Sequence, residues 1–150
     1  MPDVSFYWAG DGQYKDEILK VLGKFKNFHW LGPLEYPDKV REFLSDIDVY
    51  ALITGMDLAP LSLKEAQLME KPVISTDVGG NSEMMDDNVT GFLVKEGESK
   101  EIIEKISLLI RDKQLSVDMG KKGRRFIQEN YSLKRSAENF LEIIRPYVNK

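Results

Sequence analysis

Cysteine is absent from this 150-residue chain, and histidine occurs only once. Without cysteine the chain can form no disulfide, no thiolate nucleophile and no cysteine-ligated zinc site. No apolar run approaches the roughly 20 residues that a membrane-spanning helix needs. Apolar residues still make up 42% of the sequence, which is ordinary for a globular protein. The composition therefore predicts one globular domain with a hydrophobic core.

Basic residues are scarce in the first two thirds of the chain. Residues 1–100 carry 10 Lys/Arg against 18 Asp/Glu, a net −8, and residues 101–150 carry 11 against 7, a net +4, which together give the formal −4. Non-specific nucleic-acid binding depends on basic side chains that neutralise phosphates, so we expect no nucleic-acid partner. The basic run at residues 121–125 has two readings: a surface for a membrane or an anionic acceptor, or the solvated face of a helix.

Short apolar segments alternate with amphipathic helical segments over the first 94 residues. Strands are expected at residues 4–9, 28–31, 49–53, 73–75 and 92–94, and helices at about 13–22, 38–44, 61–69 and 83–86. This alternation predicts parallel strands joined by right-handed crossovers. The almost wholly apolar segment 49–53 is typical of a central strand. Further helices are expected at about 99–111, 114–130 and from residue 132 onward. The predicted class is a Rossmann-like α/β fold: a parallel sheet flanked by helices, with a helical C-terminal segment.

Residues 57–92 hold most of the specific chemistry. Asp57 stands on a loop, Pro60 suits the first position of the next helix, and Glu65 lies inside that helix. Carboxylates accept paired hydrogen bonds from vicinal diols, and the free N–H groups at Leu61 and Ser62 suit a phosphate. The plainer alternative is a loop acid and a surface helix residue, and spacing alone leaves both open.

A second turn and helix start follow in the same stretch. Gly79 and Gly80 form the turn, and Asn81 or Ser82 suits the cap of the helix after it. The whole run resembles the C-terminal, donor-binding domain of retaining GT-B glycosyltransferases of family 4, also called group 1. The matching residues are Asp57, Glu65-Ala66, Lys71-Pro72-Val73-Ile74-Ser75-Thr76-Asp77-Val78-Gly79-Gly80-Asn81-Ser82-Glu83, Thr90-Gly91-Phe92-Leu93-Val94, Ala9-Gly10-Asp11-Gly12, Trp30-Leu31-Gly32 and Tyr131-Ser132.

The resemblance implies a role for each candidate site residue. Asp57 and Glu65 are the candidate catalytic residues, with Asp57 against the hydroxyls of the transferred sugar and Glu65 against the nucleotide ribose. Leu61 and Ser62 would offer N–H groups to the diphosphate. Residues Gly10 and Gly32 would line the diphosphate or base side. The resemblance implies no metal and no cofactor, only a nucleotide diphosphate sugar as donor substrate and a glycan or lipid-linked acceptor.

Two features depart from the family pattern. The first motif acid is Asp57 where the family usually has glutamate, and Leu58 replaces the usual glycine. The chain also begins after the family's first strand and basic phosphate-binding loop, and it lacks the N-terminal acceptor domain. We therefore expect residues 1–150 to be a single donor-binding domain, a fragment of a larger two-domain enzyme that is inactive alone.

The remaining expectations concern the parent protein. It is expected in the cytoplasm, with peripheral membrane contact if its acceptor is lipid-linked. One alternative is a nucleotide-sugar epimerase with the same GT-B architecture. Another is a non-catalytic binding module, whose uncovered sheet edge would favour self-association.

Overall fold

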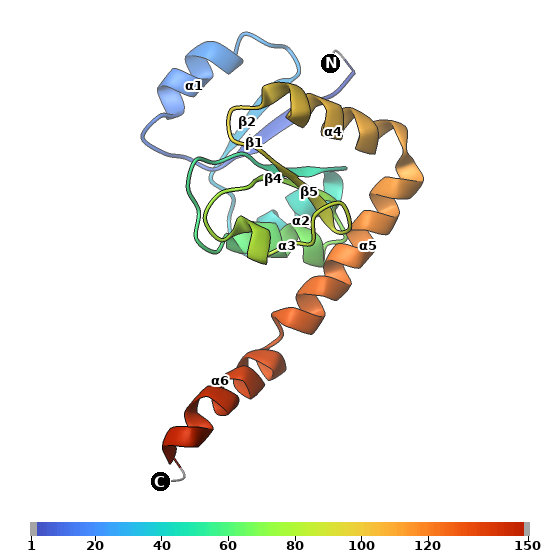
Figure 1. Cartoon of the computed structure of the whole chain (residues 1–150). Coiled ribbons are helices and arrows are strands. Elements are labelled where there is room, and N and C mark those ends of the chain that lie inside the picture. The colour runs from blue at the N-terminus through green and yellow to red at the C-terminus, as the bar shows by residue number, and fades with distance from the viewer. Residues whose placement is uncertain (1–2, 149–150) are drawn as a thin grey trace. The chain divides into compact units, whose positions relative to one another are not determined.

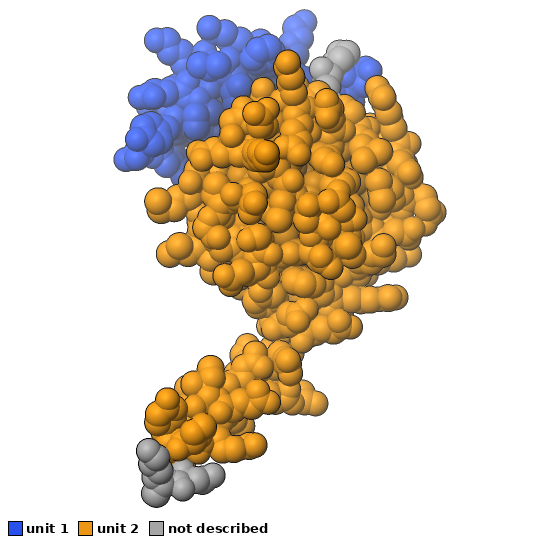
Figure 2. All heavy atoms as spheres, viewed as in Figure 1, with its two compact units in different colours: residues 1–43 blue, residues 44–150 orange. Residues whose placement is uncertain are grey.

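The computed structural model describes residues 3–148 of the chain. Strands and helices alternate up to residue 94, and three consecutive helices follow (Figure 1). The chain divides into two compact units, residues 1–43 and residues 44–150 (Figure 2). The boundary falls inside helix α2 (Asp38–Asp46). Each unit has its own parallel sheet, so the two are described separately.

The first unit is built on two parallel strands, β1 (Phe6–Ala9) and β2 (Phe28–Gly32), joined through helix α1 (Lys15–Leu22). Aromatic side chains face one another across the strand pair. The rings of Tyr7 and His29 stack with their centroids 4.9 Å apart. The only histidine of the chain is therefore a packing residue of this small sheet.

The second unit contains a three-stranded parallel sheet in the order β3-β4-β5. Its strands are β3 (Tyr50–Leu52), β4 (Val73–Thr76) and β5 (Gly91–Val94). Every residue of β4 is buried, as expected for a strand with a neighbour on each side. Among the described residues β3 pairs only with β4, and Ala51 is exposed. The prediction that 49–53 forms a central strand is therefore wrong for this sheet.

Helices and one short 3-10 turn complete the second unit. They are α3 (Leu61–Leu68), η1 (Asn81–Glu83), α4 (Ser99–Arg111), α5 (Lys113–Asn130) and α6 (Leu133–Val148). The core contains side chains from β4, β5, α4 and α5. Its buried members are Ile74, Phe92, Val94, Leu109 and Met119. This core fixes the sheet on which the candidate site stands.

Two glycines let α5 approach the segment that follows α3. A Cβ atom on Gly120 would lie 1.9 Å from the Glu70 carbonyl oxygen, and one on Gly123 would lie 3.2 Å from the Gln67 side chain. The basic residues around Gly123 all point to solvent: Lys121, Lys122, Arg124 and Arg125 are exposed. Arg124 forms an ion pair with Glu70 at 3.2 Å. The basic side chains thus lie on the exposed side of a helix whose glycines face inward, which leaves both readings of the basic run open.

The predicted α/β class is confirmed, with parallel strands flanked by helices and a helical C-terminal segment. That residues 1–150 form one donor-binding domain stays a prediction. Of the helices between residues 3 and 148, none is both long and apolar enough to cross a membrane.

Candidate functional site

The loop after β3 is shaped by its own side chains. The Thr54 hydroxyl donates to the Met56 carbonyl at 2.9 Å and accepts from the Met56 N–H at 3.2 Å. The half-buried Asp57 then accepts a hydrogen bond from the Ala59 N–H at 3.3 Å. Such side-chain turns fold a chain locally without help from a sheet. Asp57 is thus held one turn before α3 begins.

Gly79 and Gly80 bind this loop from the other side. The Gly80 N–H donates to the Asp57 carbonyl at 3.0 Å. A Cβ on Gly79 would lie 1.8 Å from that same oxygen, and one on Gly80 would lie 1.9 Å from the Leu58 carbonyl oxygen. Both distances are far below any real Cβ contact. The glycine pair is therefore required by the close approach of two backbones, and this approach positions Asp57.

A buried hydrogen-bond network lies beneath the glycine turn. Thr76 Oγ1 accepts from the Thr54 N–H at 3.0 Å and donates to the Thr54 carbonyl at 2.6 Å. Asn81 Nδ2 donates to Ser75 Oγ and to the Thr76 carbonyl, both at 2.9 Å. The predicted capping role of Asn81 is wrong, because its side chain caps no helix and is fully buried. It ties the end of β4 to the turn instead.

Helix α3 presents two different sides. Leu63, Ala66 and Gln67 are fully buried, whereas Ser62 and Glu65 are half-buried. At 100° per residue, Ser62 and Glu65 lie together along one edge of the buried face. Pro60 precedes the helix and does not occupy its first position as predicted; the helix starts at Leu61, which is 61% exposed.

The amino end of α3 can bind a negatively charged group. The first N–H groups of any α-helix lack intrahelical acceptors, and the helix dipole adds positive potential there. Those groups belong to Leu61 and Ser62, the pair predicted from the sequence. Asp57 lies on the loop before this end of the helix, and Glu65 lies one turn inside the helix, within one continuous segment.

Tyr50 is a site residue that the sequence reasoning missed. Its hydroxyl lies near the Ser62 side chain and the carboxylates of Glu65 and Asp57. Burial raises the pKa of Tyr50, the interaction with Ser62 lowers it, and the charges of Glu65 and Asp57 raise it. One signal was available: a tyrosine in an otherwise apolar strand needs a partner for its hydroxyl.

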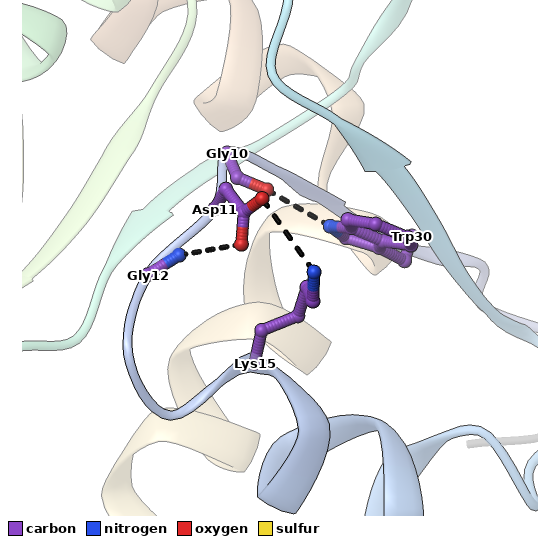
Figure 3. Close-up of polar contacts among 5 residues, drawn as sticks. All are labelled: Gly10, Asp11, Gly12, Lys15 and Trp30. Carbon is purple, nitrogen blue, oxygen red and sulfur yellow. Dashed lines mark hydrogen bonds and ion pairs between the residues drawn. The ribbon is translucent and has the colours of Figure 1, made fainter.

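The first unit holds the two remaining candidates, Gly10 and Gly32. Gly10 has φ +127° and Gly32 has φ +71°, values that favour glycine. The Gly10 N–H donates to the Gly32 carbonyl at 2.8 Å. Trp30 Nε1 donates to the Gly10 carbonyl at 2.8 Å, and the Lys15 ammonium lies 5.3 Å from the Trp30 ring centroid (Figure 3).

Asp11 completes this cluster in the first unit. Its Oδ1 accepts from the Gly12 N–H at 2.7 Å, and its Oδ2 lies 3.7 Å from Lys15 Nζ (Figure 3). The Gly10 loop is thus a shaped turn within its own unit. The four other candidates, Asp57, Leu61, Ser62 and Glu65, all lie in the second unit.

Comparison with known families decides which family these motifs belong to. The family described as glycosyl transferases group 1 matches residues 1–126. The chain belongs to this family. The loop before α3 and α3 itself therefore lie within a group 1 glycosyltransferase domain.

Individual relatives agree with this assignment. The chain is 28% identical over 141 residues to poly(ribitol-phosphate) alpha-N-acetylglucosaminyltransferase of Staphylococcus aureus, covering 93% of this chain and 29% of the relative. It is 34% identical over 133 residues to trehalose synthase of Thermococcus litoralis, covering 89% of this chain and 30% of the relative. The chain thus spans about a third or less of the length of these two relatives.

Among solved structures, S. aureus TarM in a complex that includes UDP matches with a TM-score of 0.83 and 27% identity. The match covers 93% of this chain and 28% of TarM. The GT-B fold of the group 1 domain follows from this likeness. No group of three or more acidic or histidine side chains suited to a metal ion lies among residues 3–148. The roles predicted for the individual site residues stay predictions.

Proposed function

We propose that this chain is the donor-binding part of a glycosyltransferase that moves a hexose from a nucleotide diphosphate sugar to a glycan or lipid-linked acceptor. One observation carries the proposal. Asp57 lies on the loop before α3, where its carbonyl accepts a hydrogen bond from the Gly80 N–H at 3.0 Å, and Glu65 lies within α3 itself. Diol-binding acids beside an anion-binding helix end match the two chemical parts of a nucleotide sugar.

Each group would act on a different part of the donor. Glu65 would hold the ribose hydroxyls, and Asp57 would hold the sugar hydroxyls. The N–H groups of Leu61 and Ser62 would stabilise the charge that develops on the leaving diphosphate. A charge stabilised in this way needs no metal, so we propose a metal-independent reaction without a cofactor.

Retention of the anomeric configuration is the stereochemical outcome that we propose, as in family 4. The support comes from the S. aureus relative, whose name describes an alpha-linked N-acetylglucosamine product. Nucleotide sugars of glucose and N-acetylglucosamine commonly carry the alpha linkage, so an alpha product corresponds to retention.

The parent is proposed to work in the cytoplasm, with its acceptor held by a part of the enzyme outside residues 1–150.

Nucleotide binding by Glu65→Gln tests the assignment. The exposed α4 residue Glu104 gives the matched control, Glu104→Gln. Isothermal titration with UDP, GDP and ADP should show weak binding by the unchanged chain and about 10- to 100-fold weaker binding by Glu65→Gln, the loss expected for a charged hydrogen bond. Glu104→Gln should bind as the unchanged chain does. Equal affinities for both variants would contradict the role of Glu65.

A further inference from the structure

The short link between α5 and α6 contains a tyrosine that contacts both η1 and α3. Tyr131 follows the last residue of α5, and its N–H donates to the Ile127 carbonyl at 2.9 Å. Its hydroxyl donates to the carbonyl of Glu83, the last residue of η1. The ammonium group of Lys64, on α3, lies 5.0 Å from the centroid of its ring. Tyr131 is therefore attached to η1 by a hydrogen bond and to α3 by a cation–π contact.

Further hydrogen bonds lead from Glu83 to the loop that carries Asp57. The Glu83 N–H donates to the Gly80 carbonyl at 3.1 Å, and the Gly80 N–H donates to the Asp57 carbonyl at 3.0 Å. Glu83 and Gly80 are the two ends of one 3-10 turn. Because such a turn is closed by a bond between residues three apart, its two ends move together. A shift of Glu83 is therefore passed on to the backbone of Asp57.

The position of Asp57 depends strongly on this series of bonds. One hydrogen bond of Asp57 is local, from the Ala59 N–H to its own carboxylate at 3.3 Å. The bond from Gly80 is the one that joins Asp57 to a distant segment. Where the Asp57 carboxylate lies relative to the sheet is thus set by where Gly80 lies.

We propose that Tyr131 is a positioning residue of the donor site. By holding Glu83 and the turn that begins at Gly80, its hydroxyl keeps the Asp57 carboxylate in place for the hexose of a nucleotide diphosphate sugar. The inference rests on the proposed function and adds to it a residue at the far end of α5. Tyr131 need not touch the sugar, since it acts through η1.

The hydroxyl and the ring of Tyr131 can be tested separately. Burial raises the pKa of Tyr131, and the charge of Glu83 raises it further, so the hydroxyl keeps the proton that it donates. The ring contacts Lys64 and also Phe126, whose ring centroid lies 6.2 Å away. Phenylalanine would preserve these ring contacts and lose the hydrogen bond. A role in packing alone therefore predicts unchanged sugar recognition in Tyr131→Phe.

The test compares each nucleoside diphosphate with its hexose conjugate, which isolates the contribution of the sugar. Unchanged chain, Tyr131→Phe, Asp57→Asn and the double variant are titrated with UDP and UDP-glucose, GDP and GDP-mannose, and ADP and ADP-glucose. Tyr147→Phe is the matched control, because Tyr147 is 78% exposed on α6. Urea unfolding of each variant shows whether a change in binding reflects lost folding instead.

The expected result is weaker recognition of the hexose. Asp57→Asn should lower the ratio of conjugate to diphosphate affinity about 10- to 100-fold, the range for a hydrogen bond to a charged group. Tyr131→Phe should lower it about two- to tenfold, the range for one neutral hydrogen bond. The double variant should lose no more than Asp57→Asn alone, and Tyr147→Phe should keep the full ratio. The amide signals of Glu83 and Gly80 should shift in ligand-free Tyr131→Phe.

Two failures are distinguishable. If none of the six nucleotides binds, or if Asp57→Asn keeps the ratio of the unchanged chain, the proposed sugar role of Asp57 fails and the positioning role fails with it. If Asp57→Asn lowers the ratio and Tyr131→Phe keeps it, the role of Tyr131 alone is overturned. A further loss in the double variant beyond Asp57→Asn also overturns it, because Tyr131 would then not act through Asp57.

Discussion

Replacing Gly80 by alanine should release the loop that carries Asp57. The new Cβ would lie 1.9 Å from the Leu58 carbonyl oxygen, and real Cβ atoms keep at least 3.0 Å, so the two backbones must separate by about 1.1 Å or more. The φ of Gly80 is −95°, which alanine adopts without strain. The whole effect therefore comes from the contact.

The magnitude has two parts. Overpacking of this kind costs about 1 to 3 kcal/mol. A separation of that size also breaks the 3.0 Å hydrogen bond from the Gly80 N–H to the Asp57 carbonyl, whose net contribution is about 1 kcal/mol. Gly80→Ala should thus lower the free energy of unfolding by about 2 to 4 kcal/mol. Gly79→Ala is a less clean test, because its φ of +54° adds backbone strain.

Urea unfolding followed by circular dichroism measures this loss. Gly12→Ala is the matched control, since a Cβ there meets no atom within 4 Å, and it should change stability by under about 0.5 kcal/mol. Amide signals of residues 54–62 should shift in Gly80→Ala only. If Gly80→Ala were as stable as Gly12→Ala, with unmoved signals, the reasoning about the loop would be refuted.

Three other predictions concern the second unit. The free energy of unfolding should fall as pH rises above the ordinary tyrosine pKa of 10.0, because folding raises the pKa of Tyr50 and the unfolded chain loses its proton first; urea titrations at increasing pH should show a smaller fall in Tyr50→Phe. Asn81→Ala should lower the free energy of unfolding by about 2 to 3 kcal/mol, since it removes two buried hydrogen bonds. Asn130→Ala removes one exposed hydrogen bond and should cost under about 1 kcal/mol. Equal losses for the two variants in calorimetry would contradict the buried network beneath the glycine turn. Deleting residues 133–150 should change the free energy of unfolding by under about 1 kcal/mol, because none of the described α6 residues is buried. A larger loss in urea unfolding would contradict this peripheral role of α6.

Local sequence patterns predicted the elements well where one segment carries the signal. The segment 73–75 predicted a strand, and the structure has β4 at Val73–Thr76. The apolar spacing in 99–111 predicted a helix, and the structure has α4 at Ser99–Arg111. The spacing of apolar residues is enough to predict such elements, because it involves only residues that are close together in the sequence.

The misses involve contacts between segments that are distant in sequence. The segment 49–53 looked central by composition, but which strands become neighbours depends on the whole sheet. Asn81 looked like a helix cap, a local role, whereas its partners lie on β4. The pKa of Tyr50 is affected by Ser62, a helix residue twelve positions later. No local period encodes such a pair.

The candidate site also has a part that was predictable from one segment and a part that depends on distant segments. Asp57, Leu61, Ser62 and Glu65 were predicted from one short segment; Leu61 and Ser62 begin α3, Glu65 lies within it, and Asp57 precedes it. The need for Gly79 and Gly80 to meet the Asp57 loop was not predictable, because it arises from two backbones in contact. A glycine pair reads as a turn from sequence alone.

The most direct test of the central claim is a chemical-shift titration of the 15N-labelled chain with UDP, GDP and ADP. We expect saturable shifts concentrated at residues 57–65 at millimolar nucleotide or below, with one base preferred. Unchanged signals there, or shifts confined to the basic face at residues 121–125, would contradict a nucleotide-sugar site at the start of α3.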